Sequence, residues 1–533
     1  MRANRSPEPI NGQSKARVRA AEPGARAALL PLLLALLMAA LAITSLVAQE
    51  PAASALTLEE AIDLARNNNP VFLSQSNDQG VADWQVREAY GAFLPTATAS
   101  GGFSYTAAGV QRFGTVELGR QSTDWYQSSY RLGLNWTLDG NTIFGTSNAR
   151  ANSAATAARI DAAEFGLESQ VTLQYMTALR ARDAVEVAQR QLDRARRNLQ
   201  LVETRVEAGA AAGIDGKTAE VDMGRAEVAL IQAERQLRAE KLRLMEQIGV
   251  TFEGDLTLAS SFEVFDPAWT SDELLETALA SHPSLRAFQA QERAGRAGLR
   301  QQRSQYFPSF QVSTAFSGNT LQALNEDFLV GTAESSRLRS FENCQAYHAI
   351  QNQLGVEFPG VPANCGTSVL SSDERAEILS ENRVFPFNFT KNPLSLNLGF
   401  QIPVFTGFTR QRSIEQAEAF AKDAQHQRRA EELRLRTAVT ESYDGLASAR
   451  RVVQIEERNR AVAEERLALA RQRYALGAAG IIELLDAETS ISTAERDYLN
   501  AVYQFHQSLV ALETATGRSL RPGAEEDQEA GER

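Results

Sequence analysis

The sequence contains two copies of one pattern. Pro70 and Pro95 are 25 positions apart, and Pro283 with Pro308 repeats that spacing 213 positions later. Further along, matching residues lie 268 positions apart: Tyr175 and Tyr443, Arg205 and Arg473, Gly209 and Gly477, Gly249 and Gly517. Because an internal repeat of this length reflects a repeated structural unit, we predict two tandem units rather than several unrelated domains.

The N-terminal part resembles a targeting segment. Residues 1–26 carry six basic and two acidic residues, and an apolar stretch rich in Leu and Ala follows from Ala27 to Ala48. This pattern is typical of an export signal, with cleavage expected near Ala48. A transmembrane anchor is the alternative, because the apolar stretch is about long enough to span a bilayer. Pro31 and the small residues after the apolar stretch favour the signal peptide.

Charge then excludes one class of partner. Without residues 1–48, the formal net charge changes from -12 to -16. Binding to nucleic acid depends on clustered Lys and Arg that neutralise phosphates. An acidic, exported chain is therefore not expected to bind nucleic acid.

Four segments alternate between apolar and polar residues, as strands with two different faces do. They are residues 103–107, 130–138, 310–316 and 394–404. The second and fourth are long enough for transmembrane β-strands, which need about 9–11 residues. Half-buried strands of a soluble sheet are the alternative. Because four strands cannot close a barrel and an open edge is not tolerated in lipid, a membrane location would require several chains to combine their strands.

Long helices are predicted between these strands. Apolar residues recur every seven positions from Val171 through Ala178 and Val185 to Val206, and the second copy has the corresponding series from Val439. Sustained heptads indicate coiled-coil packing. We predict helices over 58–92, 141–208 and about 215–248, and over 272–305, 410–476 and 486–516 in the second copy. The economical arrangement has strand hairpins at one end of the helices and helix–helix turns at the other.

Several junctions resemble those of the TolC family of outer-membrane efflux proteins. They are the opening Leu58–Ala65 followed by Asn69-Pro70, the junction Phe93-Leu94-Pro95, the segment Ile402–Gly407, and the turn Arg473–Gly477 followed by Leu485-Asp486-Ala487. The resemblance covers about residues 56–517. It implies a mainly α protein with a transmembrane β-barrel, in which three chains form a 12-stranded barrel that an α-helical barrel continues across the periplasm.

The resemblance also implies partners and a location. Such proteins lie in the outer membrane, contact its lipid, extend into the periplasm, and act with a periplasmic adaptor protein and an inner-membrane pump. The function expected is therefore an exit duct for efflux or for type I secretion of proteins. An exported coiled-coil structural or adhesive protein is the alternative.

On this basis the chain divides into six parts. They are a signal peptide (1–48), a linker (49–56), efflux repeat 1 (57–250), a mid-height connector (251–270), efflux repeat 2 (271–517) and an acidic tail (518–533). Between Pro308 and Gly407 the offset of the copies grows from 213 to about 267, so repeat 2 carries an insert at about 318–391. It joins two barrel strands at the end away from the helices and should lie outside the cell. A plug, a contact site and a tolerated insertion are all compatible with it, and we favour a tolerated insertion.

The insert contains both cysteines of the chain, Cys344 and Cys365. In an oxidising compartment two cysteines that flank a loop are expected to form a disulfide. A free thiol pair with chemistry of its own is the alternative.

Two acidic residues follow the second turn. Glu483 and Asp486 are three positions apart and therefore share one face of a helix. The resemblance implies that they form the periplasmic constriction, where rings of carboxylates favour cations. Alternatively, acids near a helix start only complement the helix dipole. The first copy has Asp215 opposite Glu483 but Thr218 opposite Asp486.

The same turns are the expected docking surface for the adaptor, again by resemblance. The residues concerned are Arg205, Gly209 and Gly213 in the first copy and Arg473, Gly477 and Gly480 in the second. Glycines there would let a partner approach closely, although glycine also simply ends helices. Ala212 and Gly480 replace the Ser or Thr that the family often carries, which leaves the helix starts without side-chain caps.

No catalytic chemistry is predicted. Residues 211–218 resemble a phosphate-binding loop, but its first glycine is missing and no strand precedes it. The four histidines share no metal-ligand spacing, and no nucleophile motif is present. We expect no enzyme activity, no cofactor and no metal site.

Overall fold

The computed structural model describes residues 55–121, 123–251 and 256–521, so the predicted signal peptide lies outside the described residues. The chain forms two compact units. The first comprises residues up to Glu60 together with Thr251–Ser261. In it, β1 (Ala55–Leu56) pairs in parallel with β6 (Thr257–Leu258), and the amide of Leu58 donates to Ser260 Oγ at 3.1 Å.

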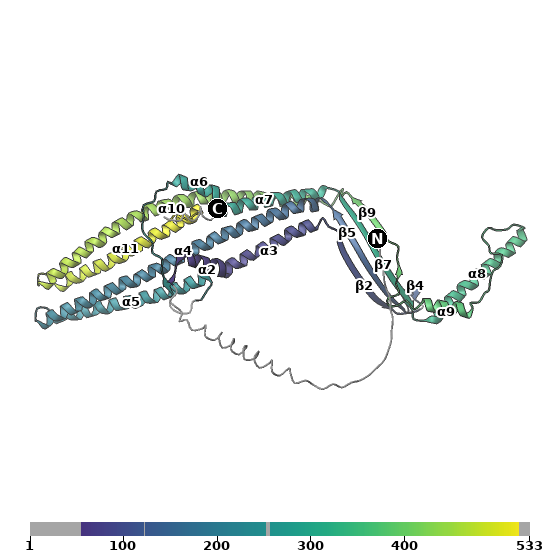
Figure 1. Ribbon diagram of the computed structural model, residues 1–533, viewed down its shortest axis with the longest axis horizontal. Coiled ribbons are helices and arrows are strands. Elements are labelled where there is room, and N and C mark those ends of the chain that lie inside the picture. The colour runs from purple at the N-terminus through teal and green to yellow at the C-terminus, as the bar shows by residue number, and fades with distance from the viewer. Residues whose placement is uncertain (1–54, 122, 252–255, 522–533) are drawn as a thin grey trace, which may run out of the picture. The chain divides into compact units, whose positions relative to one another are not determined.

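The second unit contains two long antiparallel helix pairs (Figure 1). Helix α4 (Gly140–Glu207) packs on α5 (Gly213–Ile248), and α10 (Thr409–Ala475) packs on α11 (Ile481–Thr516). These bounds lie within a few residues of the predicted helices. In Figure 1 the strands lie at one end of the helices of this unit and the two short helix–helix turns lie at the other.

The helices that precede the strands differ from the prediction, which gave one continuous helix in each copy. Residues 58–92 divide into α2 (Leu58–Asn68) and α3 (Pro70–Gly91). Residues 272–305 divide into α6 (Ser271–Ser281), α7 (Pro283–Arg303) and a short 3-10 turn (Ser304–Tyr306). The reason is proline, which disfavours helical geometry in the preceding residue but fits the first position of a new helix.

Side chains before each proline start the new helix. Asn69 Oδ1 accepts hydrogen bonds from the amides of Val71 and Phe72, and His282 Nδ1 accepts one from the amide of Ser284. These bonds satisfy amides that have no partner within the helix.

The main sheet of the second unit draws strands from both copies. Its long strands are β2 (Thr96–Thr106), β5 (Trp125–Leu138), β7 (Ser309–Ala323) and β9 (Ser395–Gln401), paired antiparallel in that order. The two-residue strand β8 (Thr390–Lys391) also pairs with β7. A separate hairpin of β3 (Gly109–Phe113) and β4 (Val116–Gln121) was not predicted, and β7 runs well past the predicted end at residue 316.

This sheet has one polar and one apolar face. The register places Leu132 of β5 opposite Ala99 of β2 and Phe316 of β7, so these side chains share a face. That apolar face carries Phe103, Tyr105, Tyr126, Tyr130, Leu132, Leu134, Trp136, Leu138, Phe310, Val312, Phe316, Leu396, Leu398 and Phe400. The opposite face carries Thr98, Ser100, Gln127, Ser129, Arg131, Asn135, Gln311, Ser313, Asn319 and Asn397. We call these the apolar face and the polar face of the sheet.

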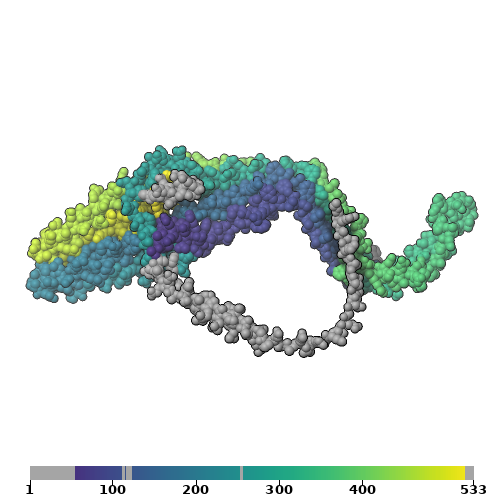
Figure 2. Space-filling view, in the orientation of Figure 1, coloured from purple at the N-terminus to yellow at the C-terminus, as the bar shows by residue number. Residues whose placement is uncertain are grey.

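Two further helices lie between β7 and β8. Helix α8 (Glu326–Leu354) and helix α9 (Ser372–Glu381) form the insert, which projects away from the long helices in the view of Figure 2. In the part of the chain that the structure describes, no helix combines the length and the apolar character needed to cross a membrane.

Candidate functional site at the helix turns

The two turns that join the long helices depend on glycine. Gly209 follows α4 with φ +68°, and Gly477 follows α10 with φ +74°. Residues with a side chain rarely adopt this left-handed geometry, whereas glycine does so readily. Both turns therefore have the same compact form in the two copies of the repeat.

The helices that leave the turns begin without side-chain caps. Ala212 precedes α5 and Gly480 precedes α11, and neither residue provides a capping side chain. In the first turn, the carboxylate of Asp215 accepts a hydrogen bond from the amide of Ala212 at 3.3 Å. Asp215 thus satisfies an amide at the helix start and complements the helix dipole.

Both predicted constriction acids are bound by arginines of α10. Arg473 Nη1 lies 2.6 Å from Glu483 Oε1, and Arg466 forms an ion pair with Asp486. The side chains of the two acids are 41% and 61% exposed, so water weakens these pairs and the charges stay accessible. The second turn therefore presents alternating acidic and basic groups rather than carboxylates alone.

A side chain from the first turn reaches the second. The guanidinium carbon of Arg205 lies 4.6 Å from the ring centroid of Tyr474, a cation–π contact. A Cβ on Gly477 would lie 3.5 Å from Arg205 Nη2, so the arginine passes directly beside the second turn. Arg205 Nη2 also donates to the carbonyl of Ala210 at 3.2 Å, which fixes its position.

Tyr474 is buried at this contact. Burial raises the pKa of its hydroxyl, the positive charge of Arg205 opposes that rise, and Asp215 adds to it. Among the described atoms, Tyr474 Oη and Arg205 Nη1 are buried without a hydrogen-bond partner.

Two ion pairs lie further from the turns, the first between the two helix pairs and the second within the pair α10 and α11. Arg194 of α4 binds Glu495 of α11 through two hydrogen bonds of 2.9 and 2.6 Å, with side chains 11% and 14% exposed. Arg471 of α10 binds Glu488 of α11 at 3.0 Å. Burial raises the pKa of Glu488, and Arg471 opposes that rise. A cavity of about 470 Å³ beside the first pair is also lined by Arg190, Arg197 and Glu464.

Some of the predicted docking residues lie beside other side chains in the structure, whereas others have free space next to them. The side chain of Arg205 passes beside Gly477 across the turns, whereas Arg473 binds Glu483. A Cβ added to Gly209, Gly213 or Gly480 would meet no atom within 4 Å. These three glycines therefore leave free space for an approaching partner in the single chain.

Four residues of this site were not predicted from the sequence, namely Arg466, Tyr474, Arg194 and Glu495. A signal for the first was present, because in an antiparallel helix pair residues at similar distances on either side of a turn face each other. Arg466 and Asp486 both lie close to ten residues from the turn around Gly477. The Arg194–Glu495 pair joins different copies of the repeat, and no local pattern indicates it.

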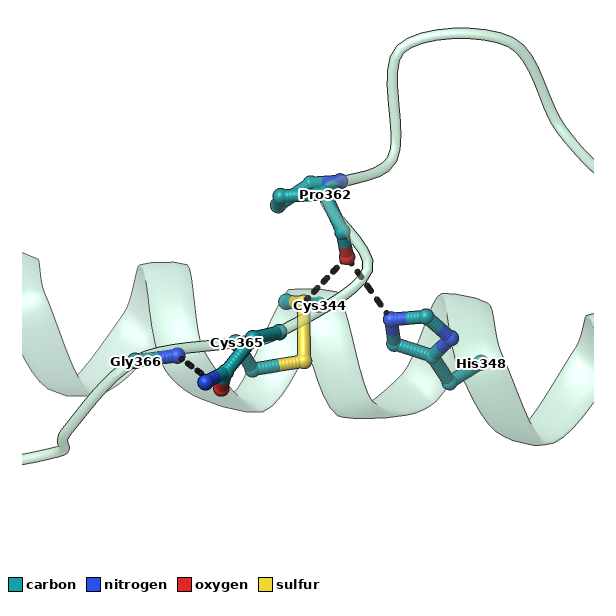
Figure 3. The surroundings of a disulfide bond; sticks show 6 residues. Cys344, His348, Pro362, Cys365 and Gly366 are labelled. Carbon is teal, nitrogen blue, oxygen red and sulfur yellow. Dashed lines mark hydrogen bonds between the residues drawn. A yellow bond between two sulfur atoms is a disulfide. The ribbon is translucent and has the colours of Figure 1, made fainter.

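In the insert, Cys344 and Cys365 form a disulfide with an S–S distance of 2.09 Å (Figure 3). His348 lies one helical turn after Cys344, and its Nε2 is 2.9 Å from the carbonyl oxygen of Pro362. The donor atoms of these three residues lie within 4.8 Å of one another, a proximity that the spacing of the histidines in the sequence does not predict. In the disulfide, neither sulfur is a thiolate ligand.

The family model described as outer membrane efflux protein matches residues 61–250 and 358–518, which is about two thirds of the chain. A comparison with curated protein sequences gave no significant match.

Solved structures are similar over most of the chain at low sequence identity. One is a membrane protein from Pseudomonas aeruginosa, with 19% identity, a TM-score of 0.63, and coverage of 87% of this chain and 90% of that one. The open state of the MtrE outer membrane channel of Neisseria gonorrhoeae has 18% identity, a TM-score of 0.63 and coverage of 87% and 89%. The outer membrane protein VceC of Vibrio cholerae has 15% identity, a TM-score of 0.61 and coverage of 87% and 97%.

Proposed function

Because this chain belongs to the outer membrane efflux protein family, we propose that three copies of it form an exit duct that is gated and docked at its helix turns. Members of the family are outer-membrane efflux channels, and this chain is accordingly a channel protein of the outer membrane that extends into the periplasm. The trimer, the gate and the partners are the parts that we propose.

The two-faced sheet supports the trimer most directly. In the described part of the chain, β2 pairs only with β5, so its other edge has no strand beside it, and β9 likewise pairs only with β7. Unpaired strand edges are costly in lipid. Three chains would join these edges into a barrel of 12 strands, with the apolar face toward lipid and the polar face toward the lumen.

The proposed gate lies at the turn between α10 and α11. Three copies of Glu483 and Asp486 would surround the narrow end of the duct, each acid with its arginine partner from α10. Such rings attract or repel ions according to their net charge. The closed state is held in this proposal by the contact between Arg205 and Tyr474, which joins the two helix pairs of one chain.

The proposed docking surface comprises the open glycines Gly209, Gly213 and Gly480 with their neighbours Arg205, Arg473 and Gly477. A periplasmic adaptor would bind there and connect the duct to an inner-membrane pump. The family relation supports efflux as the transport process. Type I protein secretion uses the same architecture, and the genes next to this one would distinguish the two. The duct itself has no proposed catalytic step, because transport is driven by the pump.

The trimer is tested by native mass spectrometry of the full chain in detergent, followed by reconstitution in planar bilayers. We expect a mass of three chains and discrete single-channel conductance. A stable monomer without conductance would exclude the duct and would favour the alternative of a coiled-coil structural protein.

A further inference from the structure

The insert returns to the sheet across its apolar face. The segment Val384–Phe389 follows α9 and precedes β8, and it contains Phe385, Phe387 and Phe389. Every ring contact of these phenylalanines that the structure gives is with a residue of the apolar face. Phe385 stacks on Tyr126 at 5.0 Å between centroids, Phe387 meets Phe103 edge-on at 6.3 Å, and Phe389 meets Tyr130 edge-on at 4.8 Å.

Polar contacts hold the segment in the same place. Ser128 Oγ donates to the carbonyl of Pro386, and it lies 2.7 Å from Thr320 Oγ1. Ser128 and Thr320 are each 1% exposed, although both belong to the apolar face. The segment therefore covers the polar groups that would otherwise interrupt this face.

Gly318 allows the close approach. A Cβ at this position would lie 2.6 Å from the ring of Tyr130 and 3.0 Å from the carbonyl oxygen of Thr390. Any side chain would displace the tyrosine or the backbone of β8, which directly follows the segment, so the packing depends on glycine here.

The length of β5 indicates the depth at which the segment Val384–Phe389 lies in the membrane. A transmembrane strand needs about 9–11 residues, and the nine residues from Leu138 to Tyr130 supply that length, starting from the helix end. Trp136, Phe310 and Phe400 lie near the helix end of this band, as aromatic residues do at one membrane boundary. Tyr130 and Phe389 lie at the opposite boundary.

We propose that the segment Val384–Phe389 is a contact surface for the headgroup region of the outer lipid leaflet. Phe387 is 71% exposed and Phe103 is 66% exposed, and they continue the apolar face beyond the band that crosses the membrane. Aromatic rings are favoured at this depth because they combine apolar contact with tolerance of partial hydration. Arg383 and Lys391 are exposed on either side of the segment, where their charges suit the phosphates of anionic headgroups. The inference rests on the proposed placement of the strands in the membrane.

The test compares nitroxide labels on three variants of the full chain, each with one added cysteine, reconstituted in vesicles of phosphatidylcholine and phosphatidylglycerol. Phe387→Cys probes the segment, Leu398→Cys probes the apolar face, and Tyr347→Cys on α8 is the water-exposed control. The native cysteines are bonded to each other and do not take the label. Frequent collisions of the label with oxygen indicate that it lies in lipid, and frequent collisions with a nickel chelate indicate that it lies in water.

We expect the ratio of oxygen to nickel collisions at Phe387 to be several-fold above that at Tyr347 and below that at Leu398. Asn388→Cys, also exposed, should behave as Phe387→Cys does and provides a second reading if one variant misfolds. Equal ratios at Phe387 and Tyr347, with Leu398 in lipid, would overturn the lipid contact and leave the duct intact. A label at Phe387 shielded from both reagents would also overturn it, since protein would then cover the segment. A water-exposed label at Leu398 would overturn the proposed function itself.

Discussion

Arg205 of the first helix pair lies over the ring of Tyr474 of the second, with 4.6 Å between the guanidinium carbon and the ring centroid. This contact joins the two turns, and it does so where Gly477 leaves room for the arginine. Separation of the two helix pairs at this end would remove the contact. Its strength therefore bears directly on any opening of the duct.

Arg205→Ala should favour the open state. A cation–π contact of this kind contributes about 1 kcal/mol, so we expect roughly a fivefold rise in the ratio of open to closed channels. Single-channel recording in planar bilayers measures this ratio. Tyr474→Phe, which keeps the ring, should behave almost as the wild type, whereas Tyr474→Ala should resemble Arg205→Ala. The control is Arg238→Ala, which removes an exposed arginine of α5 away from the turn. An unchanged ratio of open to closed channels in Arg205→Ala would show that this contact does not hold the closed state.

Replacing the two acids of α11 should shift ion selectivity toward anions. Glu483→Gln with Asp486→Asn would leave Arg473 and Arg466 without their partners, so the turn would gain net positive charge. Rings of positive charge favour anions. The reversal potential under a salt gradient measures the change, and Arg466→Gln should shift it in the opposite direction. If neither variant changes the reversal potential or the block by cations, these residues do not line the narrowest part.

Breaking the buried pair of Arg194 and Glu495 should destabilise the join between the helix pairs. Removing one partner leaves a buried charge uncompensated, which typically costs about 3–5 kcal/mol. We therefore expect Arg194→Leu to lower the thermal unfolding temperature clearly, and Arg194→Leu with Glu495→Leu to recover much of the loss. Exposed Arg196→Leu is the control. A double variant less stable than either single variant would contradict this account.

Much of the fold could be predicted from the sequence because of the repeat. Heptads located the long helices α4 and α10 to within a residue or two, because coiled-coil packing follows a fixed period. The same local reasoning placed the long strand β5 but missed its extension to Trp125, where alternation gives way to contacts with the insert. The breaks at Asn69 and His282 were missed, although each adjoins a proline that was noted.

Less of the site than of the fold could be predicted from the sequence. Its acids could be found because they lie three residues apart on one helix, but their partners Arg466 and Arg473 come from the facing helix. The contact between Arg205 and Tyr474 joins residues that are 269 positions apart. Such contacts depend on how the helix pairs pack against each other, and the local pattern of one sequence does not contain that information.

His506 should make the stability of the protein depend on pH. The imidazole packs against the rings of Phe505 and Phe262, and its Nε2 is buried without a hydrogen-bond partner among the described atoms. Burial lowers its pKa to about 4, the charge of Arg521 adds to that effect, and a hydrogen bond with the backbone of Phe262 opposes it. The folded protein therefore favours the neutral imidazole of His506.

The sign of the effect follows from which state binds the proton. Below the ordinary pKa of about 6.5, the unfolded chain takes up a proton that folded His506 does not, so stability falls as the pH decreases from about 6.5 toward 4. This single group contributes roughly 3 kcal/mol across that interval. His506→Phe should keep the apolar packing and flatten the decline, as measured by thermal unfolding of the detergent-solubilised protein at a series of pH values. His426→Phe, at an exposed position on α10, should leave the wild-type slope unchanged. If His506→Phe and the wild type lose stability in parallel over this interval, then folded His506 takes up its proton at the same pH as it does in the unfolded chain, and its burial does not control the response to acid.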